Sequence, residues 1–266
     1  MSVWLCIPSA RPVAEVNARM DKWRDMGYKI ALWRDLPEDD VIADQVLVGR
    51  YPGYAVALNT LADVLRRDLR CDWIVAAGDD TDPDPTKRAD DIARECSEYF
   101  VESSFRRASK GCDPAMLPAH LRLDMGKVRM ALDMRLPMPA ATFGVMQPTG
   151  DPWSDHQGRI IERIAGSPWL GREWCRRAYA GKGPLWPEYT HCFADEELQL
   201  VAQRYGVFWQ RPDLTQHHDN WARARGNPAD RPAFLDEANS PEHWRKYQAL
   251  FNKRKAAGFP GSELIA

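Results

Sequence analysis

The first hundred residues alternate between short apolar runs and longer segments whose apolar positions recur at helical spacing. A parallel strand that is covered on both faces is apolar throughout, so the short runs predict buried strands at 3–8, 28–33 and 73–77. The longer segments predict helices at 13–26, 54–69 and 85–100. Strands that alternate with helices indicate an α/β domain with a mostly parallel sheet and right-handed crossovers.

The second half of the chain is less regular, and residues 101–140 show only weak periodicity. Further strands are expected at 141–146 and 207–212. A well-formed helix is expected at 193–206, and an amphipathic helix near the end at 240–255. Residues 34–53 are expected to form a polar, acidic loop.

Bulk composition is that of an ordinary globular protein, with 44% hydrophobic and 28% charged residues. No apolar stretch reaches the ~20 residues of a membrane span, and the start of the chain lacks a basic leader with a long apolar core. The six cysteines form no CxxC pair, which favours reduced thiols and a cytoplasmic location over a disulfide framework or a zinc site.

Charge is unevenly distributed around a net value of −2. Residues 1–100 hold 13 Lys and Arg against 19 Asp and Glu, whereas the remainder holds 23 against 19, a balance of +4. An anionic partner over the second half would explain this asymmetry, although a solvated helix face would as well.

An acidic turn directly follows the third apolar run: Gly78 is followed by Asp79, Asp80, Asp82 and Asp84. Ligands of open α/β sheets bind beyond the carboxyl ends of the strands, and clustered carboxylates at such a place favour a divalent cation. The alternative is an acidic turn that caps the next helix. Neither GxGxxG nor GxxxxGK[ST] occurs, so the usual dinucleotide and phosphate-loop signatures are absent from the sequence.

The order of these parts resembles the nucleotide-sugar-dependent glycosyltransferases of the glycosyltransferase-A fold, especially inverting, family-2-like enzymes. The resemblance spans roughly residues 3–221. It implies a single Rossmann-like catalytic domain over 1–225, with a nucleotide-sugar half at 1–100 and an acceptor half at 101–225. Residues 226–266 would then form a C-terminal helical extension.

On the donor side, the resemblance implies a UDP-sugar as the most natural substrate. Asp35 is similar to the family's base-reading acid, and Asn59 to its helical Asn. The complete set of implied donor-binding residues is Pro8, Ser9, Arg11, Asp35, Asn59, Asp79 and Asp80.

The same resemblance implies a set of metal ligands and a catalytic base. Asp80 and Asp82 match the DxD spacing, with Asp79 and Asp80 as a neighbouring register. His217 resembles the metal-ligating His, with His218 as its rival. Carboxylate oxygens suit Mg²⁺ or Mn²⁺, and an imidazole tilts the choice toward Mn²⁺. Asp195 resembles the catalytic base that takes the acceptor proton, although an acid there could simply favour the helix N-terminus.

On the acceptor side, the Gly-, Trp- and Arg-rich segment 166–189 suggests Trp169, Arg172, Glu173 and Trp174 as contacts, although the tryptophans could equally belong to the core. The positive balance and the Trp–Arg mixture favour a hydroxymethylpyrimidine in DNA, as for the DNA-glycosylating enzymes of some bacteriophages. A polysaccharide or small metabolite is the plainer acceptor. A metal-dependent nucleotidyltransferase or phosphohydrolase, or a non-catalytic carbohydrate- or nucleic-acid-binding module, remain alternatives.

Overall fold

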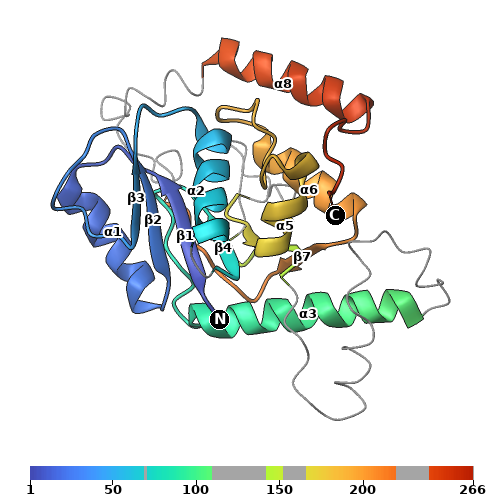
Figure 1. Cartoon of the computed structure of the whole chain (residues 1–266), viewed down its shortest axis with the longest axis horizontal. Coiled ribbons are helices and arrows are strands. Elements are labelled where there is room, and N and C mark those ends of the chain that lie inside the picture. The colour runs from blue at the N-terminus through green and yellow to red at the C-terminus, as the bar shows by residue number, and fades with distance from the viewer. Residues whose placement is uncertain (69–70, 110–141, 152–165, 220–239, 266) are drawn as a thin grey trace.

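The computed structural model describes residues 1–68, 71–109, 142–151, 166–219 and 240–265. These residues form a seven-stranded sheet with helices on both faces (Figure 1). The strands are β1 (Val3–Pro8), β2 (Lys29–Arg34), β3 (Gln45–Val48), β4 (Trp73–Ala76), β5 (Val145–Pro148), β6 (Trp169–Gly171) and β7 (Phe208–Arg211). The helices are α1 (Val13–Asp25), α2 (Tyr54–Asp68), α3 (Ala89–Ser109), α5 (Arg172–Arg177), α6 (Ala194–Arg204) and α8 (Pro241–Ala256), with a 3₁₀ turn at Tyr179–Gly181.

The strand order is β3-β2-β1-β4-β6-β5-β7. Neighbouring strands are parallel except where β6 pairs with β4 and with β5. The other six strands therefore point the same way, and their carboxyl ends lie along one edge of the sheet. This confirms the expectation of an α/β fold with a mostly parallel sheet.

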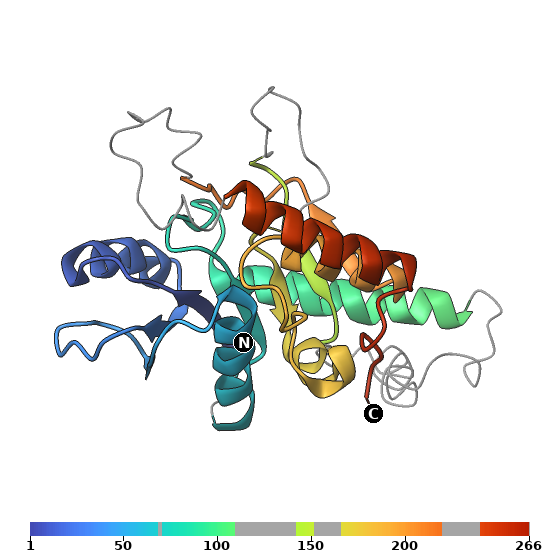
Figure 2. The same cartoon turned by 90° about the horizontal axis from the view of Figure 1, so that it is seen from above.

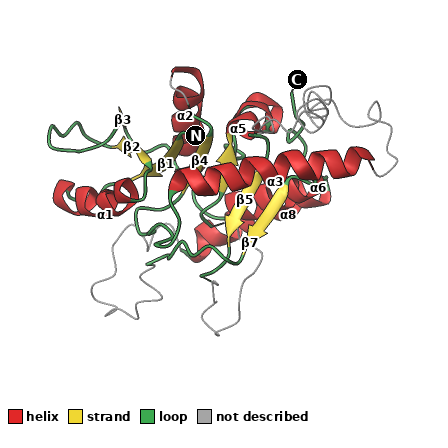
Figure 3. Cartoon of the chain, turned by 90° about the horizontal axis from the view of Figure 1, so that it is seen from below, coloured by secondary structure: helices red, strands yellow, loops and turns green. Residues whose placement is uncertain are grey.

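Helices cover both faces of the sheet, with α1 and α3 on one face and α2 and α5 on the other (Figure 3). From β1 the chain moves outward through β2 to β3, and α2 then returns it to β4 on the other side of β1. The order of strands thus reverses between β1 and β4. In open α/β sheets, the crevice outside such a switch point is the usual ligand site.

Two strands differ from the expectation. β3 lies within the segment expected to be a polar loop; its three apolar residues, 46–48, are only half-buried or exposed, and they form a shorter run than those of the predicted strands. β6 has three residues and lies in the segment expected to contact an acceptor. The expected strand at 141–146 is β5 at Val145–Pro148, and the helix expected from residue 85 begins at Ala89 and runs to Ser109, across the expected division at residue 100.

The C-terminal helix α8 lies against α6 (Figure 2). The Arg254 guanidinium donates two hydrogen bonds to the Glu197 carboxylate, at 2.8 and 2.7 Å, and Glu197 is fully buried. The Tyr189 hydroxyl donates a third at 2.8 Å. This ion pair joins the expected C-terminal extension to the body of the domain. No helix in the described ranges is long and apolar enough to cross a membrane.

Candidate functional site

The switch point between β1 and β4 is joined by contacts between their carboxyl-terminal loops. The Ser9 hydroxyl donates to Asp79 Oδ2 at 2.6 Å, and Arg11 Nε lies 3.1 Å from Asp79 Oδ1. Ser9 is buried and Pro8, the last residue of β1, is partly buried. Three residues expected to bind the donor, Ser9, Arg11 and Asp79, therefore meet where a ligand of this fold class would lie.

Arg34, at the end of β2, shapes the loop between β1 and α1, a role that the sequence did not reveal. Its guanidinium donates to the carbonyls of Ser9, at 2.7 Å, and of Arg11, at 2.9 Å. It also pairs with Glu38, and only 3% of its surface is exposed. A buried Arg that binds two carbonyls of this loop fixes the backbone that presents Ser9 and Arg11. The signal was an Arg directly before Asp35 at a strand end, but two of its three partners are main-chain carbonyls, which no side-chain pattern reveals.

The acidic turn is paired with the segment that follows β7. Thr81 and His218 form an antiparallel bridge, the Asp219 amide donates to the Asp80 carbonyl at 2.7 Å, and the Asp82 amide donates to the His217 carbonyl at 2.8 Å. This pairing brings His218 Nε2 to 2.9 Å from Asp80 Oδ1. The expected rival His218, rather than His217, is therefore the imidazole that contacts Asp80.

Asp151, after β5, orients both histidines. Its Oδ2 accepts the His218 amide at 3.1 Å and lies 3.2 Å from His217 Nδ1. The His217 side chain is 56% exposed. The His217 side chain therefore turns toward Asp151 and away from Asp80, with which it was expected to bind a metal. The sequence singled out Asp151 only as a member of a nearby loop.

The remaining acids of the turn have structural partners. Asp82 contacts Lys22 Nζ at 2.7 Å and Arg19 Nη1 at 3.5 Å, both on α1, and its expected role as a metal ligand stays a prediction. Asp84 accepts the Thr86 hydroxyl and the amides of Thr86, Lys87 and Thr215; because α3 begins only at Ala89, these bonds stabilise the turn and do not cap the helix. Burial alone would raise the pKa of Asp84, but these hydrogen bonds, the one from the Thr86 hydroxyl first, lower it below its ordinary value.

Asp195 lies in the first turn of α6, beside the start of α2. Burial raises its pKa above the ordinary value, despite a hydrogen bond from the Glu196 amide at 3.0 Å. Burial and then the Asp195 carboxylate raise the pKa of Tyr54, and Asp80 contributes to the same shift. Tyr54 therefore lies within electrostatic range of both Asp80 and Asp195, which places the two carboxylates around one region. A carboxyl with a raised pKa is suited to accept a proton.

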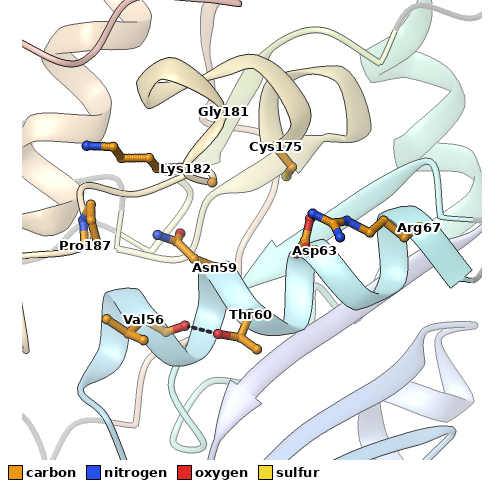
Figure 4. A pocket seen from close by; sticks show the side chains of 10 residues that line it. Val56, Asn59, Thr60, Asp63, Arg67, Cys175, Gly181, Lys182 and Pro187 are labelled. Atoms are coloured by element: carbon orange, nitrogen blue, oxygen red, sulfur yellow. Dashed lines mark hydrogen bonds and ion pairs between the residues drawn. The ribbon is translucent and has the colours of Figure 1, made fainter.

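Asn59 lies on α2 at a cavity of about 310 Å³ between α2 and the loop around Lys182 (Figure 4). Its Nδ2 donates to the Leu185 carbonyl at 2.8 Å, and its Oδ1 accepts the Leu185 amide at 3.0 Å. A Cβ at Gly183 would lie 2.6 Å from Asn59 Cγ. We therefore correct the donor-binding expectation: Asn59 holds the 183–185 loop against α2.

The four residues expected to bind the acceptor lie elsewhere. Trp169 and Trp174 have no exposed surface, and the Trp169 indole donates to Gln216 Oε1 at 2.6 Å. Neither ring can stack on an acceptor, so this expectation was wrong and the core alternative holds. Because β6 runs antiparallel to β4, Arg172 and Glu173 lie at the opposite edge of the sheet from the acidic turn. There Arg172 binds the Arg66 and Asp72 carbonyls, and Glu173 binds Arg176.

Asp35 follows β2 at the same edge as the acidic turn. It is exposed, and its Oδ1 accepts the Tyr51 amide at 2.8 Å. Burial and then Asp35 raise the pKa of Tyr51 to about 12. The carboxylate thus has a fixed orientation next to a 42% exposed aromatic ring. Its base-reading role stays a prediction.

Asp80 and His218 are residue types that bind a divalent cation together with phosphate. Their 2.9 Å contact is a direct hydrogen-bonded or ionic contact, and two neighbouring ligands of an octahedral cation at about 2.1 Å would also be about 3 Å apart. Within the described ranges, no group of three or more His, Cys, Asp or Glu side chains is arranged to hold a metal ion. Mg²⁺ sites commonly use one or two protein ligands together with substrate phosphates and water, so two protein ligands suffice.

The Asp80 carboxylate can lie beside His218 because residue 78 is a glycine and has no Cβ. A Cβ at Gly78 would lie 2.5 Å from Asp80 Oδ1, closer than real contacts allow. The absence of a side chain at Gly78 therefore leaves room for the Asp80 side chain.

No protein-family model matches this chain, and no curated protein matches it significantly. The functional argument therefore depends on the geometry of the site.

Proposed function

We propose that this protein is a metal-dependent glycosyltransferase of the glycosyltransferase-A type, which transfers a sugar from a nucleoside-diphosphate sugar to a hydroxyl with inversion. The observation that carries the proposal is the Asp80–His218 contact, next to the switch point between β1 and β4. The sheet order, with β6 as the reversed strand, is compatible with this fold.

The donor would bind along the carboxyl edge formed by β1, β2 and β4. Asp80 and His218 would hold Mn²⁺ or Mg²⁺ against the diphosphate, where a bound cation neutralises the charge that develops on the leaving group. Arg11 is the nearest cation on the β1 side, and Ser9 and Arg34 fix its loop. Asp35, with the exposed Tyr51 ring beside it, would contact the nucleobase.

Asp195 would act as the general base. The acceptor hydroxyl is a poor nucleophile, so a carboxylate must take its proton as the oxygen attacks the anomeric carbon. Its raised pKa brings proton affinity closer to neutral pH than that of an exposed Asp. Direct displacement of the nucleoside diphosphate from the opposite face inverts the anomeric centre.

The acceptor is proposed to be a hydroxymethylpyrimidine in DNA. Of the two features that favoured it, the Trp–Arg mixture no longer counts, because Trp169 and Trp174 lie in the core and Arg172 lies at the far edge of the sheet. The +4 balance of residues 101–266 remains. The five described cysteines are free thiols, in keeping with the proposed cytoplasmic location.

Cleavage of nucleotide sugars tests the proposal directly. The purified protein is incubated with UDP-, GDP-, ADP-, CDP- and dTDP-sugars, with Mn²⁺ or with a chelator, and released nucleotide is measured. The proposal predicts Mn²⁺-dependent release of a nucleoside diphosphate from one donor class. Release of nucleoside monophosphate or pyrophosphate would favour a phosphohydrolase or nucleotidyltransferase, and no cleavage would favour a binding module.

A further inference from the structure

The outer surface of α8 is strongly basic. The helix carries five basic residues and one acidic residue, Glu242. Arg254 is buried against Glu197 and is neutralised there. The other four basic side chains are exposed: Arg245, Lys246, Lys253 and Lys255. Although the protein has a net charge of −2, four exposed cationic side chains lie on this one helix.

An exposed indole lies on the same helix, next to the turn that carries the proposed base. Trp244 is 45% exposed, and its ring centroid lies 4.9 Å from that of Phe193. Phe193 has a φ of 71° and directly precedes α6, two residues before Asp195. His243, on the same turn of α8, lies 3.4 Å from Thr190. The first turn of α8 therefore packs against the segment that leads into α6, the helix that carries Asp195.

The inner face of α8 is already occupied. Tyr247 and Phe251 are buried, and Phe251 stacks with Phe193 at 5.4 Å and tilts against Phe259 at 6.0 Å. A helix that binds a lipid surface needs a free apolar face, and here that face is packed against the domain. The surface that remains combines separated cations with a single exposed aromatic ring.

We propose that the outer surface of α8 binds the nucleic acid that carries the acceptor, as unpaired single strand. Trp244 stacks on a base, and Arg245 and Lys255, the two exposed cations nearest to its side of the helix, contact phosphates. Positive charge along a backbone track, with an aromatic platform for bases, is how proteins bind single strands. From Arg245 to Lys255 the helix rises about 15 Å, enough to span several nucleotides. This inference rests on the proposed function, because it names the acceptor's docking surface.

Binding of a fluorescein-labelled single-stranded oligonucleotide, followed by anisotropy over a range of salt concentrations, tests the proposal without donor or metal. Trp244→Leu keeps an apolar contact with Phe193 but removes the stacking face, and we expect about 5- to 150-fold weaker binding. Trp244→Phe keeps an aromatic face and should restore part of the affinity. Arg245→Ala/Lys255→Ala should lower the slope of log K against log salt by about 1.4, since each phosphate contact contributes about 0.7 on single strands.

The matched control is Arg88→Ala/Arg94→Ala, which removes the same charge from side chains that are 59% and 58% exposed. Figure 1 shows α3, which carries Arg94, and α8 at opposite edges of the molecule. The control should bind like wild type. Equal weakening by both double variants would show a diffuse charge effect and overturn the proposal, as would unchanged binding by Trp244→Leu.

Two further measurements distinguish failure of this inference from failure of the proposed glycosyltransferase function. Mn²⁺-dependent cleavage of the donor should be unchanged in Arg245→Ala/Lys255→Ala, because neither side chain contacts the donor edge or the segment that leads to Asp195. If wild type cleaves a donor but binds no oligonucleotide, the docking proposal fails and the glycosyltransferase stands. If dextran sulfate or anionic vesicles compete as well as the oligonucleotide at equal charge, the surface recognises charge alone and the proposal fails.

Discussion

Asp80 Oδ1 lies 2.9 Å from His218 Nε2, although the two residues follow different strands, β4 and β7. They meet because Thr81 and His218 form a bridge between the acidic turn and the segment after β7. Both segments leave the sheet at the same edge, since β4 and β7 point the same way. The pair is therefore a direct product of the sheet topology.

The two adjacent histidines should differ in effect. His218→Ala should reduce Mn²⁺-dependent donor cleavage by at least tenfold and raise the Mn²⁺ concentration needed for half-maximal rate, because it removes a proposed ligand. His217→Ala, whose side chain is exposed and contacts Asp151, should change that concentration little. Steady-state rates over a Mn²⁺ titration measure both. A larger loss for His217→Ala would restore the original assignment of His217.

Gly78→Ala should weaken the metal site without unfolding the protein. Gly78 is not among the glycines with positive φ, so the backbone accepts alanine, but the new Cβ would lie 2.5 Å from Asp80 Oδ1. The Asp80 side chain must then move. We expect a raised Mn²⁺ requirement with a nearly unchanged melting temperature. Gly258→Ala provides a comparison, since a Cβ there meets nothing within 4 Å, although its φ of +73° strains the backbone instead. Normal Mn²⁺ dependence in Gly78→Ala would show that this placement of Asp80 does not matter.

Asp195→Asn should slow transfer by ~10²–10⁴-fold while leaving donor affinity nearly unchanged, because it removes only the proton acceptor. In wild type, transfer should fall as the pH drops through the raised pKa of Asp195, since the protonated carboxyl cannot act as a base. Rapid-mix transfer rates and donor titrations across pH separate the two effects. A variant with weaker donor binding but normal transfer would remove Asp195 from this role.

The same carboxyl should lower stability at neutral pH. Because the folded state holds this proton more tightly than the unfolded state, folding stability falls as the pH rises from about 3.9 through the raised pKa. Above that pKa the buried carboxyl is fully ionised, and the loss of folding stability is complete. Asp195→Asn should therefore melt at a higher temperature than wild type at pH 7, with a smaller difference near pH 4. Equal melting temperatures at both pH values would contradict the desolvation of this side chain.

Arg254→Ala should destabilise the whole domain by about 3–5 kcal/mol, because it leaves the Glu197 charge buried without a partner. Glu197 is 0% exposed and Arg254 6% exposed. Urea unfolding measures the effect, and Lys255→Ala, on the exposed face of α8, should stay within about 0.5 kcal/mol of wild type. A small effect of Arg254→Ala, or a separate unfolding step for α8, would show that the helix is a detachable extension.

The sequence was sufficient to predict the positions of the helices and strands that have a strong periodic or apolar pattern. β1, β2 and β4 are continuous apolar runs, and α6 has a clear apolar face and a terminal glycine, so their positions followed from burial on a parallel sheet. From these strands it also followed that Ser9 and the acidic turn share one edge. β3 and β6 have four and three residues, too few for a periodic signal.

The expected acceptor residues were assigned to the wrong edge of the sheet because the sequence did not predict the direction of β6. A three-residue strand carries no information about whether it runs parallel or antiparallel, and reversal sends Arg172 and Glu173 to the far edge. Likewise, burial of Trp169 and Trp174 depends on tertiary packing, because a Trp–Arg mixture is equally typical of a surface and of a core boundary. Asn59 is held by main-chain groups, and most partners of Arg34 and Asp84 are main-chain groups as well; residue identities alone do not indicate them.

The most direct test of the central claim is nucleotide binding at the Asp80–His218 pair. Calorimetric titration of UDP, with GDP and CDP in parallel, into wild type and Asp80→Asn is carried out with Mn²⁺ and with a chelator. The account predicts that one nucleoside diphosphate binds wild type only when Mn²⁺ is present, and that Asp80→Asn loses this binding while its melting curve stays cooperative. Equal affinity of Asp80→Asn and wild type for the nucleotide in Mn²⁺ would contradict the account.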